Sequence, residues 1–492
     1  MNKLSQVFFR NRQILLFAAL LVSSTFSAFI VSNAHTNTAQ AQDNGVGQTP
    51  LMGWSTWSFL RTQPTETAVK EQALSEVKYL KSHGYVYVNL DDYWYANPAK
   101  SVDMYGRWIA DNKSFPSGIP ALAAYVHSLG LKFGIYVTPG IPAAAVNQNT
   151  PIEGTMYNAQ DIADTSKYEL NYNYKNQPFG KVMYYIDYSK PGSQEFINSW
   201  ANLFASWGVD FVKLDGVGDV GNINSKDVNY FKLVGVSNTH SKGIDAISDI
   251  EAWSKALQQS GRPMYLQVSN SLNVQNGSKL RQNANSSRIE PDVECYDFTN
   301  LPSIKCATLT NWKKVSSRFK DEPLWTAVGG SGRWNDLDSL NVGDGSSDGL
   351  TNDERQSYMT LWAISAAPLY SGDNLTTLDS YGLSLLTNDE VIAVDQAGVV
   401  GSLVYNDTQQ RQIWSAKESD GSYVVALFNL SSSNLSVSVK WPQLGFDKPA
   451  KVRDLWNQLD LGTYPSNKEF SIKLNPHGSS LIRVTPTENN GF

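Results

Sequence analysis

Four acidic residues stand where apolar, strand-like runs of this sequence stop. Asp91 and Asp92 close the run YVYVNL, and Asp215 closes the run FVKL. Asp292 lies in the run RIEPDVE. Hydrolysis of a glycosidic bond needs two carboxyl groups, since one attacks or stabilises the anomeric carbon while the other protonates the departing oxygen. One acid at a strand end is more often a capping or solvated residue, but four such acids favour glycosidase chemistry.

Lys213 comes two residues before Asp215, so both side chains face the same side of a strand. A cation beside Asp215 would keep its carboxylate ionised and fit for nucleophilic attack. The alternative is an ion pair inside the protein, which is compatible with the same role. A carboxyl separation of about 5 Å leads to retention and roughly 6.5–9.5 Å to inversion, and the sequence does not contain that distance.

Strand-like and helix-like runs alternate from residue 50 onward. The strand-like runs lie near 51–55, 85–90, 131–136, 209–214, 264–268, 287–292, 324–328 and 367–370. About eight such units within ~350 residues predict an α/β fold of the (β/α)8 or TIM-barrel type, in which acids at the strand ends converge on one face. An open doubly wound sheet is the alternative, but no G-x-G-x-x-G follows the first strand.

Near residue 396 the alternation of strand-like and helix-like runs gives way to strand-like runs alone. Short alternating runs such as RQIWSAK, SYVVALFNL and SSLIRVTP follow, separated by Ser, Asn, Gly and Pro. This pattern is typical of an antiparallel β-sandwich. We therefore expect a catalytic barrel over residues 42–395 and a C-terminal antiparallel β-sandwich over residues 396–492.

The N-terminal segment has the features of an export signal. Basic residues precede the apolar stretch ILLFAALLVSSTFSAFIV, and AQA at Ala39 to Ala41 is a small-residue cleavage pattern. We expect a signal peptide over residues 1–41, and a secreted or periplasmic protein with no membrane attachment after cleavage. The alternative is a membrane anchor formed by an uncleaved signal, because the apolar stretch is long for a signal.

Composition narrows the choice of partners. The 492 residues carry a formal net charge of −6, which gives no basic footprint for nucleic acid. The chain has 14 Trp, 24 Tyr and 19 Phe, and such residues either fill a core or stack on sugar rings. The two cysteines, Cys295 and Cys306, can form a disulfide after export, the alternative being two buried thiols. Two cysteines without an HExxH motif do not make a zinc site, so we expect no metal.

A set of motifs resembles glycoside hydrolase family 27, the α-galactosidase and α-N-acetylgalactosaminidase family. In order along the chain they are TPLMGWSTWSF, VNLDDYW, LKFGIY, WGVDFVKLDG, GRWNDLDSL, LWAISAAPLYSGDNL and TNDEVIAVDQ. They cover about residues 48 to 397, and VRDLWNQLDLGTY with NPHGSSLIRVTP extends the resemblance toward the C-terminus. The resemblance implies a retaining enzyme on a (β/α)8 barrel with a C-terminal β domain and no metal or other cofactor.

Carried over by position, the resemblance implies that Asp215 is the nucleophile and Asp292 the acid/base. It implies that Asp91 and Asp92 hold the 4- and 6-hydroxyls of the sugar, and that Arg288 binds substrate. The full set of substrate-binding residues so implied is Trp54, Asp91, Asp92, Tyr136, Lys213, Ser269, Arg288 and Asp336.

Two departures from the family pattern bear on the substrate. α-Galactosidases of the family carry a glutamate that contacts the sugar 2-hydroxyl, and Ser269 occupies that position here. A small residue there resembles the N-acetylgalactosaminidases, which need room for an acetamido group. In addition, Tyr93 replaces the cysteine of the usual DDCW motif, and a Cys295–Cys306 bridge would be a local substitute for the family's disulfides.

The sequence thus predicts a secreted retaining exo-glycosidase that acts on terminal α-D-galactosyl residues of an oligo- or polysaccharide. One alternative is a family 27 enzyme for another sugar, namely an α-N-acetylgalactosaminidase, a β-L-arabinopyranosidase or an isomaltose-releasing glucanase. Another is a carbohydrate-binding protein without activity, which a neutral residue at position 215 or 292 would have favoured.

Overall fold

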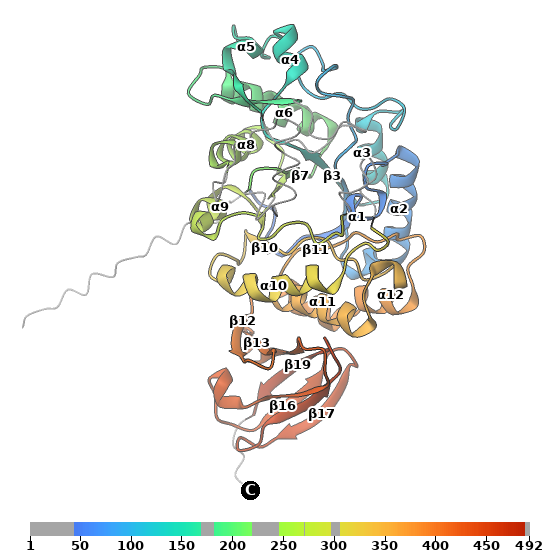
Figure 1. The fold of residues 1–492 in the computed structure, drawn as a ribbon, viewed down its shortest axis with the longest axis vertical. Helices are drawn as coiled ribbons and strands as arrows, with labels where there is room; N and C mark the ends of the chain where they lie inside the picture. Colours follow the sequence, from blue (N-terminus) through green and yellow to red (C-terminus); the bar gives the residue numbers. More distant parts are fainter. Residues whose placement is uncertain (1–43, 169–181, 219–245, 270, 297–305, 488–492) are drawn as a thin grey trace, which may run out of the picture. The chain divides into compact units, whose positions relative to one another are not determined.

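Eight parallel strands form the central sheet of the computed structural model, which describes residues 44–168, 182–218, 246–269, 271–296 and 306–487 (Figure 1). They lie in the spatial order β10-β9-β8-β7-β3-β2-β1-β11, and a parallel bridge from Leu340 to Ser371 joins the two ends. This confirms the predicted (β/α)8 barrel. The strands are β1 (Met52–Ser55), β2 (Tyr87–Leu90), β3 (Lys132–Val137), β7 (Phe211–Leu214), β8 (Tyr265–Val268), β9 (Ser286–Arg288), β10 (Trp334–Asp336) and β11 (Leu369–Ser371).

Helices connect the barrel strands, as right-handed parallel crossovers require. Their ends carry local signals of helix termini: the Thr351 side chain accepts from the N–H of Glu354, and Gly84 and Gly208 close their segments with positive φ. The helices are α2 (Glu66–Tyr79), α3 (Ile119–Ser128), α6 (Ser193–Trp207), α8 (Ile247–Gln259), α9 (Gly277–Asn283), α10 (Trp312–Trp325), α11 (Asn352–Ile364), α12 (Ser380–Leu386) and α13 (Asp389–Gln396).

A small excursion separates β3 from α6. It contains a three-stranded antiparallel sheet in the order β4-β6-β5 and two short helices. Their bounds are β4 (Ile141–Pro142), α4 (Ala143–Gln148), α5 (Ala159–Ile162), β5 (Ala163–Tyr168) and β6 (Met183–Ile186). Because this segment follows the carboxyl end of β3, it belongs to the face of the barrel where the acids lie.

Two predicted strands need correction. The segment 324–328, predicted to be the seventh strand, is not a strand, since α10 continues to Trp325. The seventh strand is β10, three residues with buried polar Asn335 and Asp336, which show no apolar pattern. The sixth strand is shorter than the predicted 287–292 and ends at Arg288, so Asp292 lies in the following loop.

The C-terminal region forms the predicted antiparallel sandwich. One sheet has six strands in the order β12-β13-β14-β19-β16-β17, and β15 pairs with β18 in a second sheet. Two strands were missed from the sequence, β16 and β17, whose segments contain charged residues. The strands are β12 (Ser402–Asn406), β13 (Arg411–Lys417), β14 (Tyr423–Asn429), β15 (Leu435–Val439), β16 (Ala450–Asp454), β17 (Leu459–Tyr464), β18 (Phe470–Leu474) and β19 (Ser479–Pro486).

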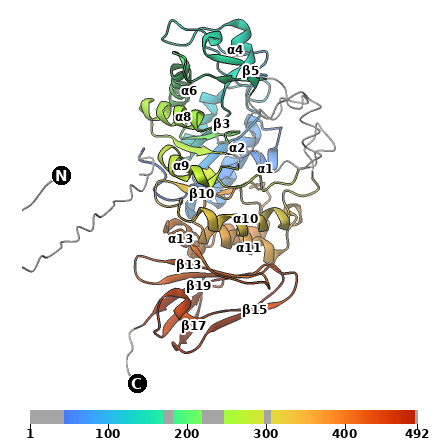
Figure 2. The same ribbon diagram turned by 60° about the vertical axis from the view of Figure 1, so that its left-hand side comes forward.

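Strand β14 is buried on both faces, because its alternate side chains pack into two different hydrophobic cores. Val425 and Leu427 belong to the core between the two sheets, whereas Val424 and Phe428 pack with the core of the barrel helices. The Phe428 ring lies edge-on to Phe319 of α10, with ring centroids 4.7 Å apart. Figures 1 and 2 both show α10 and α11 beside β13 and β19, so the six-stranded sheet packs on these helices.

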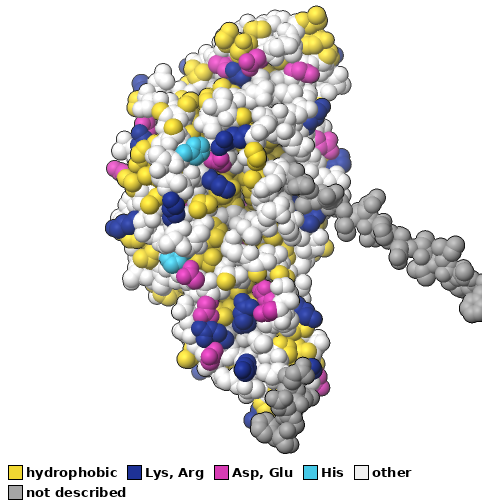
Figure 3. Space-filling view, turned by 180° about the vertical axis from the view of Figure 1, so that it is seen from behind, with side chains coloured by type: hydrophobic (Ala, Val, Ile, Leu, Met, Phe, Trp, Pro, Cys, Tyr) yellow, Lys and Arg dark blue, Asp and Glu magenta, His cyan; other side chains and the backbone are white. Residues whose placement is uncertain are grey.

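The surface mixes charges of both signs. On the face shown in Figure 3, Lys and Arg side chains lie among Asp and Glu, and hydrophobic side chains are dispersed. Within the described ranges, no helix is both long and apolar enough to cross a bilayer. The predicted signal peptide lies outside the described residues.

Candidate active site

The inner faces of three barrel strands begin with an aromatic residue and end in an acid or a serine. In β7, Phe211 begins the strand, Lys213 lies in its middle and Asp215 directly follows its end. Alternate residues of a strand face the same side, so all three point into the barrel. The same order recurs in two other strands: Tyr87, Asn89 and Asp91 along β2, and Tyr265, Gln267 and Ser269 along β8.

Lys213 forms its direct ion pair with Asp91. Its Nζ lies 2.8 Å from Oδ2 of Asp91, and both side chains are almost fully buried. Burial alone would lower the pKa of Lys213, but the charges of Asp91 and Asp215 outweigh it and raise that pKa. The direct partner of Lys213 is thus Asp91, which follows β2. This is the ion pair inside the protein that was the alternative interpretation of Lys213, and the charge of Lys213 still acts on Asp215.

The Asp91 carboxylate is held by several donors. Asn89 Nδ2 donates to Oδ2 over 3.1 Å, and the backbone N–H of Asp92 donates to Oδ1 over 2.9 Å. The backbone N–H of Asp91 itself donates to Thr56 Oγ1 over 3.0 Å. These contacts fix the direction of a charged group that stays buried.

Asp92 lies in a different electrostatic environment from its neighbour. Its Oδ1 accepts a hydrogen bond of 2.6 Å from the Tyr95 hydroxyl and one of 2.8 Å from the N–H of Tyr93. Burial, with the nearby charges of Asp91 and Asp215, raises the pKa of Asp92 to about 7, although both hydrogen bonds oppose the shift. Tyr93 itself has a left-handed backbone, with φ 72°, which turns the chain sharply after the acid pair.

Asp215 accepts hydrogen bonds from two hydroxyl groups. Tyr136 in β3 donates to its Oδ2 over 3.1 Å, and Ser269 at the end of β8 donates to its Oδ1. The carboxylate is therefore held from both sides by neutral donors from the two strands that flank β7. Such positioning suits a group that must attack a carbon atom along a defined line.

Asp292 lies between cations and a tyrosine. Arg288 donates to its Oδ1 over 2.7 Å, and the Tyr296 hydroxyl donates to its Oδ2 over 2.5 Å. Burial alone would raise the pKa of Asp292, but the charges of Arg288 and Lys213, with the Tyr296 hydrogen bond, outweigh it and lower that pKa. The side chain remains 27% exposed, so it can be reached from solvent.

Two predicted site residues are fully buried and bonded within the fold. Trp54 in β1 donates its indole N–H to the carbonyl oxygen of Asp373 over 2.8 Å. Asp336 in β10 accepts from Gln267 Nε2 and, over 3.2 Å, from the Tyr370 hydroxyl. The structure thus brings Asp91, Tyr136, Lys213, Asp215 and Ser269 into one network and pairs Arg288 with Asp292, while Asp336 and Trp54 bond to other groups.

Two functional candidates were missed in the sequence. Tyr95 and Tyr296 each donate a hydroxyl to an acid of the site. Tyr95 follows Asp92 by three residues and Tyr296 follows Asp292 by four, so a tyrosine three or four residues after a predicted site acid was the available signal. Tyr296 also follows Cys295, and Cys295 and Cys306 form the expected disulfide.

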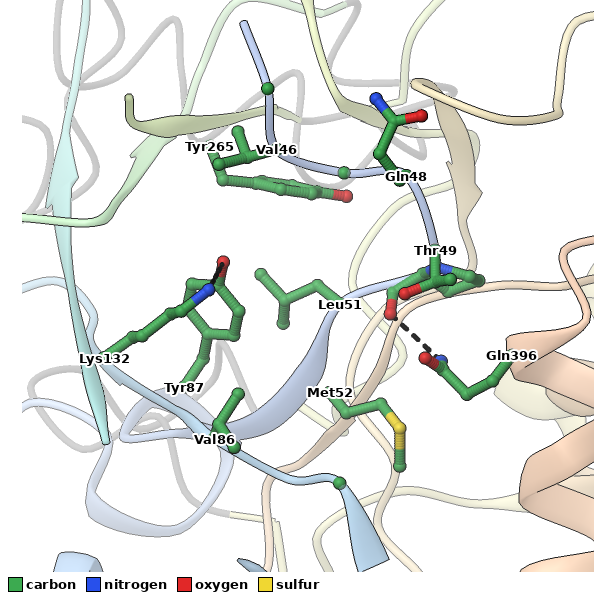
Figure 4. A pocket seen from close by; sticks show the side chains of 14 residues that line it. Val46, Gln48, Thr49, Leu51, Met52, Val86, Tyr87, Lys132, Tyr265 and Gln396 are labelled. Carbon is green, nitrogen blue, oxygen red and sulfur yellow. Dashed lines mark hydrogen bonds between the residues drawn. The ribbon is translucent and has the colours of Figure 1, made fainter. Parts of the chain in front are cut away.

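A cavity of about 270 Å³ lies at the opposite, amino-terminal end of the barrel (Figure 4). Lys132 is the only charged side chain among the described residues that line it, and its Nζ donates to the Tyr87 hydroxyl over 3.2 Å. A lining without a carboxyl group cannot supply acid–base hydrolysis. The acid-rich end is therefore the candidate active site. The cavity is lined by residues 45–52 with Val86, Tyr87, Lys132, Tyr265 and Gln396, among others.

Comparison with known proteins agrees with this fold. A family model described as alpha galactosidase A matches residues 49–174 and 179–397, and one described as the alpha galactosidase C-terminal beta sandwich domain matches residues 408–484. The chain belongs to this family, glycoside hydrolase family 27, and is a glycoside hydrolase. The resemblance drawn from the motifs is thereby confirmed.

The similar proteins differ in the sugar that they act on. An alpha-galactosidase of Coffea arabica is 31% identical over 451 residues, which are 90% of this chain and 95% of that protein. A β-L-arabinopyranosidase structure from Geobacillus stearothermophilus is 33% identical with a TM-score of 0.77, covering 90% of this chain and 98% of that one. A Bacillus halodurans structure provisionally assigned as an alpha-N-acetylgalactosaminidase is 27% identical with a TM-score of 0.70, covering 89% and 98%.

Proposed function

We propose that this glycoside hydrolase is an exported retaining exo-enzyme that releases terminal α-D-galactosyl residues from an oligo- or polysaccharide. Asp215 attacks the anomeric carbon and forms a covalent glycosyl-enzyme, while Asp292 protonates the departing oxygen. Asp292 then removes a proton from the water that hydrolyses the intermediate. The hydroxyls of Tyr136 and Ser269, which hold the Asp215 carboxylate, support the assignment of the nucleophile.

The adjacent pair of Asp91 and Asp92 supports galactose as the sugar of the substrate. Two buried carboxyl groups at the end of one strand offer acceptors for two hydroxyls on the same side of one sugar. Galactose supplies a 4- and a 6-hydroxyl, whereas arabinopyranose lacks the carbon that bears the 6-hydroxyl. A pocket with both carboxyls therefore favours the galactoside, because the shorter sugar leaves one buried polar group unpaired.

Activity on β-L-arabinopyranosides is the second candidate, supported by the 33% identity to an enzyme named for that sugar. Ser269 bears on the 2-position instead. Its hydroxyl donates to Asp215, so it offers the sugar a small neutral group rather than a charged acceptor. We expect selectivity at the 2-position to be relaxed, with some turnover of the N-acetyl analogue.

The test is kcat/KM for the 4-nitrophenyl α-D-galactoside, β-L-arabinopyranoside and α-N-acetylgalactosaminide, together with an isomaltose-type glucan. We expect the galactoside to exceed the arabinopyranoside by about 10- to 100-fold, the cost of one unpaired buried group. Asp92→Ala should reduce that ratio, because it removes one of the two acceptors. Cleavage of the glucan with no turnover of the galactoside would show that Asp91 and Asp92 serve another sugar.

Retention is tested separately by proton NMR of the first product formed. A covalent intermediate on Asp215 predicts that the α-anomer of galactose appears before mutarotation. First appearance of the β-anomer would mean that water attacks directly and that Asp215 is not a nucleophile. Export is supported by the Cys295–Cys306 disulfide, since such bonds persist in oxidising compartments.

A further inference from the structure

Tyr296 has a second hydrogen bond besides the one that it donates to Asp292. The indole Nε1 of Trp57, the first residue of α1 (Trp57–Leu60), donates to the Tyr296 hydroxyl oxygen over 2.7 Å. The hydroxyl thus accepts from Trp57 and donates to Oδ2 of Asp292, which fixes its direction. The result is a relay of three residues from α1 to the proposed acid/base.

The ring of Tyr296 is held as firmly as its hydroxyl. The Arg61 guanidinium lies 5.1 Å and the Lys314 Nζ 5.9 Å from the ring centroid, both suited to cation–π attraction. The preceding residue, Cys295, is bonded to Cys306, and its backbone N–H donates to the carbonyl of Leu309. The disulfide and the two cations therefore limit where this tyrosine can move.

The contact creates a conflict for a group that acts as an acid. A general acid must carry its proton when the glycosidic oxygen arrives, yet Asp292 receives one hydrogen bond from Arg288 and one from Tyr296. Both donors favour the charged carboxylate. Arg288 lies 2.7 Å from both Asp292 and Asp338, so it also balances a second buried acid. The Tyr296 hydroxyl is a neutral donor, so its withdrawal from Asp292 leaves no buried charge without its counter-ion, and it can be released at less cost than Arg288.

We propose that Tyr296 is a positioning residue that keeps Asp292 in its base form and yields Oδ2 to the glycosidic oxygen of the substrate. In the resting enzyme the tyrosine holds the ionised carboxylate in place. When the leaving group binds, its oxygen takes the position of the Tyr296 hydroxyl. Asp292, whose side chain is partly exposed, takes up a proton from solvent and passes it to that oxygen as the glycosidic bond breaks. After the sugar is attached to Asp215, the tyrosine returns and supports Asp292 as the base that activates water. This inference rests on the proposed acid/base role of Asp292.

Other charged groups face Asp292 and remain in a variant that lacks the tyrosine hydroxyl. Lys213 acts on it from β7, Arg288 from β9, and Lys314 of α10 donates to its backbone oxygen over 3.1 Å. Glu294 and Asp338 place carboxylate oxygens within 4.8 Å of its own. Burial and the charge of Asp292 raise the pKa of Tyr296 well above its ordinary value, so the hydroxyl stays a donor across the working range.

The test compares the pH profile of kcat/KM for wild type and Tyr296→Phe on an α-galactosyl disaccharide. Loss of one donor to the carboxylate should move the alkaline limb, where the acid loses its proton, upward by about one pH unit. The shift should be much smaller with a 2,4-dinitrophenyl galactoside, whose leaving group needs no proton. A tyrosine with only a structural role would lower stability and kcat without moving the limb.

Trp57→Phe is the matched control, because it removes the donor to Tyr296 and keeps a ring. It should move the limb in the same direction by less, and it carries the test alone if Tyr296→Phe does not fold. A double Cys295→Ser, Cys306→Ser variant should lie between the two. An unchanged or lowered alkaline limb in a folded variant, with an active wild type, would overturn this inference and leave the proposed function standing. An inactive wild type would instead remove the proposed function itself.

Discussion

The two ends of the barrel are made from the same strands but have opposite chemistry. At the amino-terminal end, large apolar and aromatic side chains form one cluster. At the carboxyl-terminal end, the same strands continue into acids and a serine. The cluster consists of Leu51, Tyr87, Phe211, Tyr265 and Tyr370.

The polar layer between the two ends shows why this arrangement is stable. Lys213, Asn89 and Gln267 lie in the middle of their strands, and each bonds to an acid nearer the carboxyl end. The aromatic layer below them excludes water from that side, which strengthens each charged contact above it. A buried acid that lost its donor would cost several kcal/mol, so the middle layer is what allows acids to converge on one face.

The largest difference is expected between single substitutions at the two opposite ends of β7. Asp215→Asn should lower kcat by roughly 10⁴-fold or more while keeping the fold, on the scale of nucleophile deletions in other hydrolases. Phe211→Leu, four residues earlier on the same face, should keep kcat within about threefold and cost about 1–2 kcal/mol of unfolding free energy.

Steady-state kinetics and thermal unfolding of both β7 variants would measure this difference. Azide added to an Asp215→Gly variant should restore turnover and yield the β-galactosyl azide. A folded Asp215→Asn protein with near-normal turnover would contradict the contrast between a catalytic carboxyl-terminal end and a structural amino-terminal end of the barrel.

Asp292→Asn should give a loss that depends on the leaving group. We expect single-turnover glycosylation to fall by roughly 10²- to 10⁴-fold on a natural disaccharide and to change little on an activated aryl galactoside. Glu294→Gln is the control, since Glu294 is a buried acid two residues away whose Oε1 accepts from Ser58. Equal losses on both substrates in the Asp292 variant would reduce its role to holding the sugar.

The neighbours Asp91 and Asp92 should respond in opposite directions when each is changed to asparagine. Asp91→Asn breaks a buried ion pair with Lys213 and should cost about 3 kcal/mol of unfolding free energy at neutral pH. Asp92→Asn should stabilise the protein at neutral pH. The raised pKa of Asp92 means that above about pH 4 the unfolded chain ionises this group more readily than the folded chain does, which lowers the stability of the wild type. The amide can still accept from Tyr95 and from the N–H of Tyr93.

The sign of the Asp92 effect follows from its titration. The folded state holds this proton more tightly, so the wild-type contribution is complete below the ordinary pKa near 4 and is lost as pH rises to about 7. Asparagine does not titrate, and its advantage should grow from near zero at pH 4 to about 4 kcal/mol at pH 8 at most. Denaturant unfolding at these two pH values is the measurement. A constant difference between them would show that Asp92 is ionised throughout.

The smallest effect is expected from the lysine at the amino-terminal end. Lys132→Met should leave kcat unchanged and alter unfolding free energy by less than about 0.5 kcal/mol, since its side chain is exposed and bonds only weakly to Tyr87. Lys213→Met should cost about 3 kcal/mol or more, because Asp91 stays buried without its cation. Similar effects of the two substitutions would contradict the contrast between the ends.

The sequence by itself determined most of the barrel strands and the acids that follow β2 and β7. Alternating periods, the Thr351 cap and the closing glycines are local signals, so the barrel and the sandwich could be predicted from them. The convergence of Asp91 and Asp215 also followed, since parallel strands of a barrel direct their carboxyl ends to one face.

Only the tertiary structure decided which groups meet across strands. Strand β10 escaped prediction because Asn335 and Asp336 are polar, and their burial is stable only where Glu322, Gln267 and Tyr370 bond to them. Lys213 pairs with Asp91 because closing the barrel brings β2 within reach across β3, a proximity that no spacing along the chain contains. Hydrogen bonds of side chains depend on distances in space, and these are fixed only when the sheet closes.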